Sequence, residues 1–180
     1  MSQWFAKKAV WISTLALLSA VVFCVAFVFF YTRSARNATK PNLVGSGKTL
    51  PDADLVDIDN QPLSASELKN GRVVLVFIAP DCGACNKESD FLKDVIGKRS
   101  DVRFYGVISY GDMVSSLRDA KEKFPFKVFY DRGFKLAGPL GINRVPIKIF
   151  VDDGVIKKSW GGATVDEKAQ GDFVRWLAEV

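Results

Sequence analysis

Apolar positions recur along the chain with two different periods and divide it into alternating strands and helices. The run at residues 73–79 is almost continuously apolar and rich in β-branched side chains, which predicts a central strand buried on both faces. Further strands are predicted at 55–58, 102–110, 127–130, 145–151 and 155–160, and helices at 64–68, 82–96, 113–124 and 164–180. Strands that alternate with helices and end in a hairpin predict an α/β sandwich with a mixed sheet.

Local signals mark where two of these helices begin. Ser64 with Glu67, and Thr164 with Glu167, have the spacing of a capping box, so Ser64 and Thr164 are each expected to start a helix. The buried faces of the last two helices are expected to comprise Val114, Leu117, Ala120 and Phe124, and then Phe173, Trp176, Leu177 and Val180.

A second kind of apolar run lies near the N-terminus. Residues 9–31 contain no charged side chain, and about 23 residues at ~1.5 Å each give roughly 35 Å, enough to cross a bilayer. We therefore expect a tail at 1–8, a transmembrane anchor at 9–31, a linker at 32–49 and a globular domain at 50–180. A cleaved signal peptide is the alternative, but its apolar core would be unusually long and no A-x-A site follows.

Charge and the absence of histidine narrow the function. The net charge is +5, and Lys and Arg are spread along the chain without an arginine-rich block, so nucleic acid is not an expected partner. With no histidine, Cys–His and Ser–His catalysis are excluded and most metal sites are disfavoured. Basic residues flank the 9–31 run on both sides, so charge alone leaves the orientation of the anchor open.

Two cysteines three residues apart follow the central strand. After a break at Pro80 and Asp81, Cys82 opens the next helix, where unpaired N–H groups favour a thiolate. Cys85, one turn later, can close a disulfide, so we expect thiol–disulfide exchange with Cys82 as nucleophile and no cofactor beyond the pair. The alternatives are an inert pair or a metal site, for which three cysteines supply too few ligands. Haem attachment would need a histidine where Asn86 stands.

Glu88 lies one turn after Cys85, on the stripe that Leu92 and Ile96 mark as core-facing. A carboxylate at such a position is costly unless it has a partner or a task. Because desolvation favours its neutral form, we expect Glu88 to exchange a proton with Cys85 in a chain that has no histidine. The alternative is that Glu88 turns outward and pairs with a surface lysine.

Together these motifs resemble the thioredoxin superfamily and, within it, the membrane-anchored TlpA/ResA-like disulfide reductases. The resemblance covers about residues 50–180 and rests on Leu50-Pro51-Asp52, the 73–79 strand, the C-G-A-C pair, Glu88 and Arg144-Val145-Pro146. It implies a thioredoxin-like sandwich with a cis bond before Pro146, which faces the cysteine pair, and a role for Val145 in pairing with an extended substrate. It also implies a domain outside the cytoplasm, periplasmic or on the outer face of the cell membrane, with the N-terminus inside.

The resemblance further implies reduction of protein disulfides, with apocytochrome c as a substrate during cytochrome c maturation. Electrons would come from a transmembrane thiol donor, and membrane lipid would surround the anchor. Asp81 stands where the family usually has Trp, and no basic residue lies between the cysteines; both features disfavour the Cys82 thiolate and favour a reductant over a strong oxidant. Val76 stands where thioredoxin has a buried Asp, so any buried carboxylate must come from elsewhere.

Three other functions stay open on the sequence. They are an oxidase or isomerase, a maturation factor for another secreted protein such as a periplasmic dehydrogenase, and a non-catalytic thioredoxin-like binding module tethered to the membrane.

Overall fold

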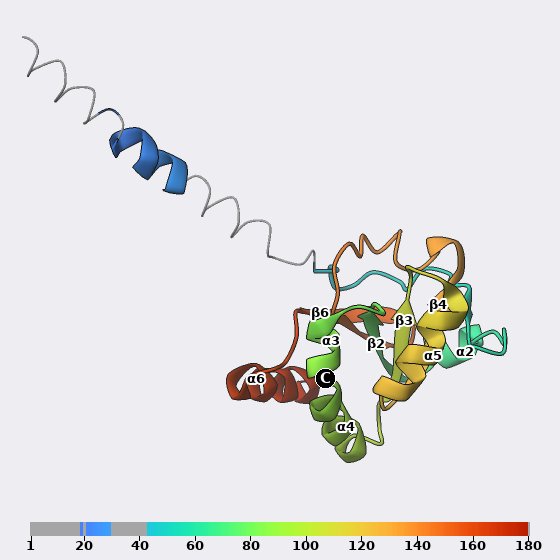
Figure 1. Cartoon of the computed structure of the whole chain (residues 1–180). Helices are drawn as coiled ribbons and strands as arrows, with labels where there is room; N and C mark the ends of the chain where they lie inside the picture. The colour runs from blue at the N-terminus through green and yellow to red at the C-terminus, as the bar shows by residue number, and fades with distance from the viewer. Residues whose placement is uncertain (1–18, 20, 30–42, 180) are drawn as a thin grey trace, which may run out of the picture. The chain divides into compact units, whose positions relative to one another are not determined.

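The computed structural model describes residue 19, residues 21–29 and residues 43–179. The chain divides into two units, residues 1–40 and residues 41–180, and in the first of them residues 21–29 are helical (Figure 1). None of the helices in the described part of the chain has both the length and the apolar character needed to cross a bilayer. Much of the expected anchor at 9–31 lies outside the described residues, so the anchor stays a prediction.

A six-stranded mixed sheet forms the centre of the second unit (Figure 1). Its strands are β1 (Leu55–Val56), β2 (Arg72–Ile78), β3 (Arg103–Ile108), β4 (Lys127–Asp131), β5 (Ile147–Asp152) and β6 (Val155–Gly161). They lie in the order β1-β4-β3-β2-β5-β6, with β2–β3 and β3–β4 parallel and the other neighbours antiparallel. The predicted α/β sandwich with a mixed sheet is thus confirmed.

Helices and loops cover both faces of this sheet. The helices are α2 (Ala65–Lys69), α3 (Gly83–Lys87), α4 (Ser89–Lys98), α5 (Met113–Lys123) and α6 (Glu167–Ala178), with a short 3₁₀ turn, η1 (Arg132–Phe134). Alternate residues of β2 enter two separate hydrophobic clusters, one containing α2 and the segment around 136–142, the other containing α3, α4, α5 and α6. The central strand is therefore buried on both faces, as its sequence predicts.

The helix predicted at 82–96 is in fact two helices, α3 and α4, which join at Glu88. The N–H of Glu88 donates to the carbonyl of Cys85 at 3.3 Å, three residues back instead of four, and its own carbonyl then accepts from Leu92 at 2.9 Å. Glu88 thus ends one helix and begins the next while its side chain stays fully buried.

The predicted start of the last helix at Thr164 is wrong. Asp166 caps α6, and its Oδ1 accepts from the N–H of Ala169 at 2.7 Å. Thr164 is buried and gives both its N–H and its hydroxyl to Glu88. Thr164 therefore has the spacing of a capping box, but its polar groups bind Glu88 and do not cap the helix. The capping box at Ser64 is confirmed.

Two details of the predicted helix faces differ from the structure. Val114, expected on the buried face of α5, is 43% exposed, and Ser116 is buried in that helix instead. Val180 lies outside the described residues. The other expected core positions of these two helices are buried or partly buried.

The globular domain begins before residue 50. Gly47 and Leu50 donate to the carbonyls of Ile156 and Gly154 at 2.8 Å each, and Val44 is buried in the hydrophobic core. Residues 44–49 of the expected linker are therefore bound to the β6 edge of the sheet and belong to the domain.

Candidate active site

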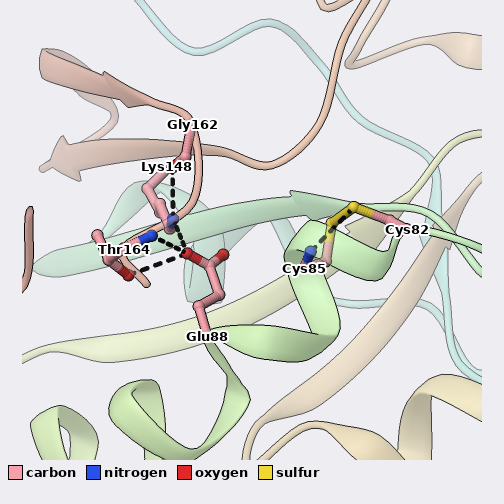
Figure 2. The surroundings of a disulfide bond; sticks show 6 residues. All are labelled: Cys82, Cys85, Glu88, Lys148, Gly162 and Thr164. Carbon is pink, nitrogen blue, oxygen red and sulfur yellow. Dashed lines mark hydrogen bonds and ion pairs between the residues drawn. A yellow bond between two sulfur atoms is a disulfide. The ribbon is translucent and has the colours of Figure 1, made fainter. Parts of the chain in front are cut away.

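Cys82 and Cys85 form a disulfide at the start of α3, with their Cα atoms 5.2 Å apart (Figure 2). Cys82 is the N-cap of α3, and its Sγ accepts a hydrogen bond from the N–H of Cys85 at 3.1 Å. Cys82 is partly exposed, whereas Cys85 is fully buried. An incoming molecule therefore meets the Cys82 sulfur first.

The Val145–Pro146 segment lies at the same end of the sheet as the cysteines. Its peptide bond is cis, as the resemblance to the thioredoxin superfamily implies. The next residue, Ile147, pairs with Phe77 near the end of β2, from which the chain continues into Cys82. Pro146 is buried, and Val145 packs against the same hydrophobic cluster as Cys82. The structure thus brings the two segments together.

Glu88 is fully buried, and one of its oxygens binds three donors. Its Oε2 accepts from Lys148 Nζ at 2.5 Å and from the N–H and hydroxyl of Thr164 at 2.9 and 3.0 Å (Figure 2). The outward-facing position considered for Glu88 is therefore wrong, and its burial is confirmed. Its second oxygen, Oε1, is buried and has no hydrogen-bond partner among the described residues. In Figure 2 this oxygen points toward the side where the disulfide lies.

Lys148 and Thr164 are the partners of Glu88 that sequence reasoning misses. The side chain of Lys148 is 0% exposed, and its Nζ donates to the Gly162 carbonyl at 3.0 Å as well as to Glu88. Burial lowers the pKa of the Lys148 ammonium, and the charge of Glu88 offsets part of that effect. The sequence does contain a signal for Lys148, since this lysine stands inside an otherwise apolar strand. A charged side chain buried in such a strand needs a partner of opposite charge.

Thr164 and Gly162 complete the surroundings of the carboxylate, and both follow the end of β6. The site is therefore assembled from the joint between α3 and α4, from β5 and from the loop between β6 and α6. In the described part of the chain, no group of three or more His, Cys, Asp or Glu side chains could hold a metal ion.

A family model described as Redoxin matches residues 45–171, which is 127 of the 180 residues (171 − 45 + 1). The chain belongs to the Redoxin family. This membership, together with the cysteine pair, makes it a thioredoxin-like thiol-disulfide oxidoreductase. The resemblance to the thioredoxin superfamily is confirmed.

Several solved structures have the same fold as this chain. A Chlorobium tepidum protein assigned as thiol:disulfide interchange protein DsbE is 16% identical, with a TM-score of 0.65 over 76% of this chain and 97% of its own. A secreted Mycobacterium tuberculosis disulfide oxidoreductase homologous to E. coli DsbE is 20% identical, with a TM-score of 0.60 over 73% and 97%. The M. tuberculosis protein DsbF is 24% identical, with a TM-score of 0.59 over 72% and 95%. At these identities the likeness establishes the fold alone.

A search of curated proteins finds no significant match to this Redoxin-family chain.

Proposed function

We propose that this chain reduces disulfide bonds of proteins outside the cytoplasm, held to the membrane by residues 9–31 with its N-terminus inside the cell. The observation that carries the proposal is the different exposure of the two sulfurs. Cys82 is partly exposed at the start of α3, and Cys85 is buried one turn later and bonded to it. This is the arrangement that two successive exchange steps require.

In the first step the thiolate of Cys82 attacks a substrate disulfide, and one substrate sulfur leaves as a thiolate. In the second step Cys85 loses its proton and attacks Cys82 Sγ, which releases the other substrate sulfur as a thiolate. The two cysteines end as a disulfide, and the substrate ends with two reduced sulfurs that take up protons. Val145 and Pro146 would hold the extended substrate beside Cys82, and Glu88 would accept the proton of Cys85.

The charge near Cys82 supports the proposed direction of the reaction. Asp81 is an exposed carboxylate next to Cys82, and neither Gly83 nor Ala84 brings a positive charge. A negative neighbour disfavours a thiolate and so opposes the stabilisation that the helix terminus and the N–H of Cys85 give the Cys82 sulfur. A pair with a less stabilised thiolate is a better reductant and a weaker oxidant.

Two observations support a location outside the cytoplasm. The uncharged run at 9–31 has the length of a membrane anchor, and one structural neighbour, the Mycobacterium tuberculosis oxidoreductase, is described as secreted. We extend the proposal to cytochrome c maturation, in which apocytochrome c would be the substrate and a transmembrane thiol protein the electron donor.

Insulin reduction by the purified full-length chain tests the proposal. All variants carry Cys24→Ser, because Cys24 is a free thiol. We expect turnover that Cys82→Ser abolishes, and a potential close to that of thioredoxin, about −270 mV. A potential near −120 mV would instead identify an oxidase, and absence of turnover would leave a binding module as the better description.

A further inference from the structure

We propose that Lys148 is a positioning residue for the exchange reaction: its buried ammonium keeps Glu88 ionised and oriented, with one oxygen free to take the proton of Cys85. This inference rests on the proposed function and extends it to a residue on a different strand. It assigns a task to a lysine that lies 60 positions away from Glu88 in the sequence.

The first step of the argument is the unequal use of the two carboxylate oxygens. Lys148 and Thr164 place three donors on Oε2 of Glu88, while Oε1 is buried with no partner among the residues that the structure describes. Asp131, a second buried carboxylate, uses both oxygens: Oδ1 accepts from Leu136 at 3.0 Å, and Oδ2 from Ala137 at 2.8 Å. Asp131 is thus satisfied on both oxygens, and Glu88 is satisfied on only one.

The second step is the position of the free oxygen. Glu88 follows Cys85 by one turn, and its N–H is bonded to the Cys85 carbonyl. Figure 2 shows Oε1 turned toward the side of the disulfide and Oε2 turned toward Lys148. The three donors on Oε2 therefore fix the rotation of the carboxylate so that its unused oxygen lies on the cysteine side.

The third step is the charge. Lys148 Nζ is held by Glu88, by the Gly162 carbonyl and by the ring of Phe173, whose centre is 5.7 Å away. Among the described residues, the titratable groups here are Cys82 and Cys85 from the start of α3, Glu88 from the α3–α4 joint and Lys148 from β5. The groups that the β6–α6 loop and α6 place against the ion pair are the Gly162 carbonyl, Thr164 and the Phe173 ring, which are uncharged. Without the ammonium, a desolvated carboxylate would take up a proton from water and could no longer accept one from Cys85.

In the resolving step the proton of the Cys85 thiol moves to Glu88 Oε1. The Cys85–Cys82 S–S bond forms, the bond between Cys82 and the substrate sulfur breaks, and that sulfur leaves with the electron pair. Glu88 then returns its proton to the leaving thiolate or to water. Lys148 takes no part in bond making and acts only on Glu88.

Infrared spectroscopy of the oxidised protein tests the charge of Glu88 without any substrate. The band of a protonated carboxyl, assigned to Glu88 by its loss in Glu88→Gln, should be absent from the parent at neutral pH. As the pH is lowered, the band of protonated Glu88 should appear in Lys148→Met at a pH at least about one unit higher than in the parent. A difference of one pH unit is a tenfold change in the proton equilibrium. Thr164→Val is the matched control, because it removes a hydrogen bond to Oε2 but no charge, and it should shift the band far less.

A protonated Glu88 in the parent at neutral pH would overturn the proposal, whatever the folding of the variants. An equal shift in Lys148→Met and Thr164→Val would also overturn it, because loss of contacts alone would then explain the effect. Neither result depends on whether the parent reduces insulin, so failure of the proposed function is recognised separately.

Kinetics provide a second readout in folded variants. The pH profile of insulin reduction should move to higher pH in Lys148→Met, with a rate about tenfold or more lower at neutral pH. If Lys148→Met does not fold, the double variant Glu88→Gln/Lys148→Met replaces it. Its profile should match that of Glu88→Gln, and a different profile would mean that Lys148 acts on the cysteines directly, which contradicts the proposal.

Discussion

Lys148 lies directly opposite Val76 in the antiparallel pairing of β5 with β2. The ammonium of a fully buried lysine is therefore anchored beside the central strand, among the apolar side chains that surround Val76. Glu88 reaches this position from the joint between two helices and supplies the opposite charge. One ion pair thus connects β5 to the segment that carries the cysteines.

The stability of the domain should depend on both members of this pair. Glu88→Gln leaves the Lys148 ammonium buried without an opposite charge, so we expect the free energy of unfolding to fall by about 3–5 kcal/mol. Urea unfolding of the oxidised protein measures the change. Thr164→Val removes one hydrogen bond to the same oxygen and should cost only about 1 kcal/mol.

The double variant Glu88→Gln/Lys148→Met is the decisive comparison. Because it contains no buried charge at this site, it should lose less stability than the sum of the two single variants. Strict additivity would mean that the two side chains are not coupled, contrary to their 2.5 Å contact.

Trapping of substrates should separate the two cysteines. With Cys85→Ser, attack by Cys82 can occur but resolution cannot, so mixed disulfides through Cys82 should accumulate. Non-reducing electrophoresis of membranes from cells that produce the variant detects them. The matched variant Cys82→Ser should give none, and equal capture by both variants would exclude Cys82 as the attacking sulfur.

Acid should weaken the fold through an exposed carboxylate distant from the cysteines. Hydrogen bonds from Arg99 lower the pKa of Asp101 to about 2, from an ordinary value of 3.8. The folded state therefore holds the proton less tightly than the unfolded chain, so the stabilisation is present above pH 3.8 and is lost as the pH falls toward 2.

Asp101→Asn tests this dependence. The difference in unfolding free energy between parent and variant should be constant at neutral pH and disappear near pH 2. It should also shrink in high salt, because Asp101 is exposed. A difference that persists unchanged down to pH 2 would contradict the assignment.

The proposed orientation is tested with reporters fused after Val180. An enzyme that is active only after export should be active there, and a strictly cytoplasmic reporter should be inactive. The same fusions to a chain without residues 1–31 serve as the control and should reverse the pattern. Activity of the cytoplasmic reporter on the full chain would invert the topology and remove the basis for an extracytoplasmic reductase.

The sequence predicts those parts of the site whose signals are local. The strand at 73–79, the helix that starts at Cys82 and the burial of Glu88 follow from hydrophobic periodicity and spacing within about 25 residues. The cis bond before Pro146 could be expected only from the family pattern, because most X-Pro bonds are trans.

The partners of Glu88 could not be predicted in this way, because they come from distant parts of the chain. Lys148 lies on a strand whose pairing with β2 is fixed only in the folded sheet. Thr164 has a strong local signal for a helix cap, and the contact with Glu88 overrides it. The break between α3 and α4 likewise has no Gly or Pro to mark it in the sequence.

The binding of residues 44–50 to the edge of β6 shortens the linker that our proposal leaves between the anchor and the domain. If residues 9–31 cross the bilayer as we propose, only residues 32–43 remain between the membrane and the domain, which is 12 residues (43 − 32 + 1). At no more than ~3.6 Å each, they extend to about 40 Å. Under this proposal Val44 would lie within that reach of the membrane surface, where the proposed transmembrane thiol donor would present its own cysteines.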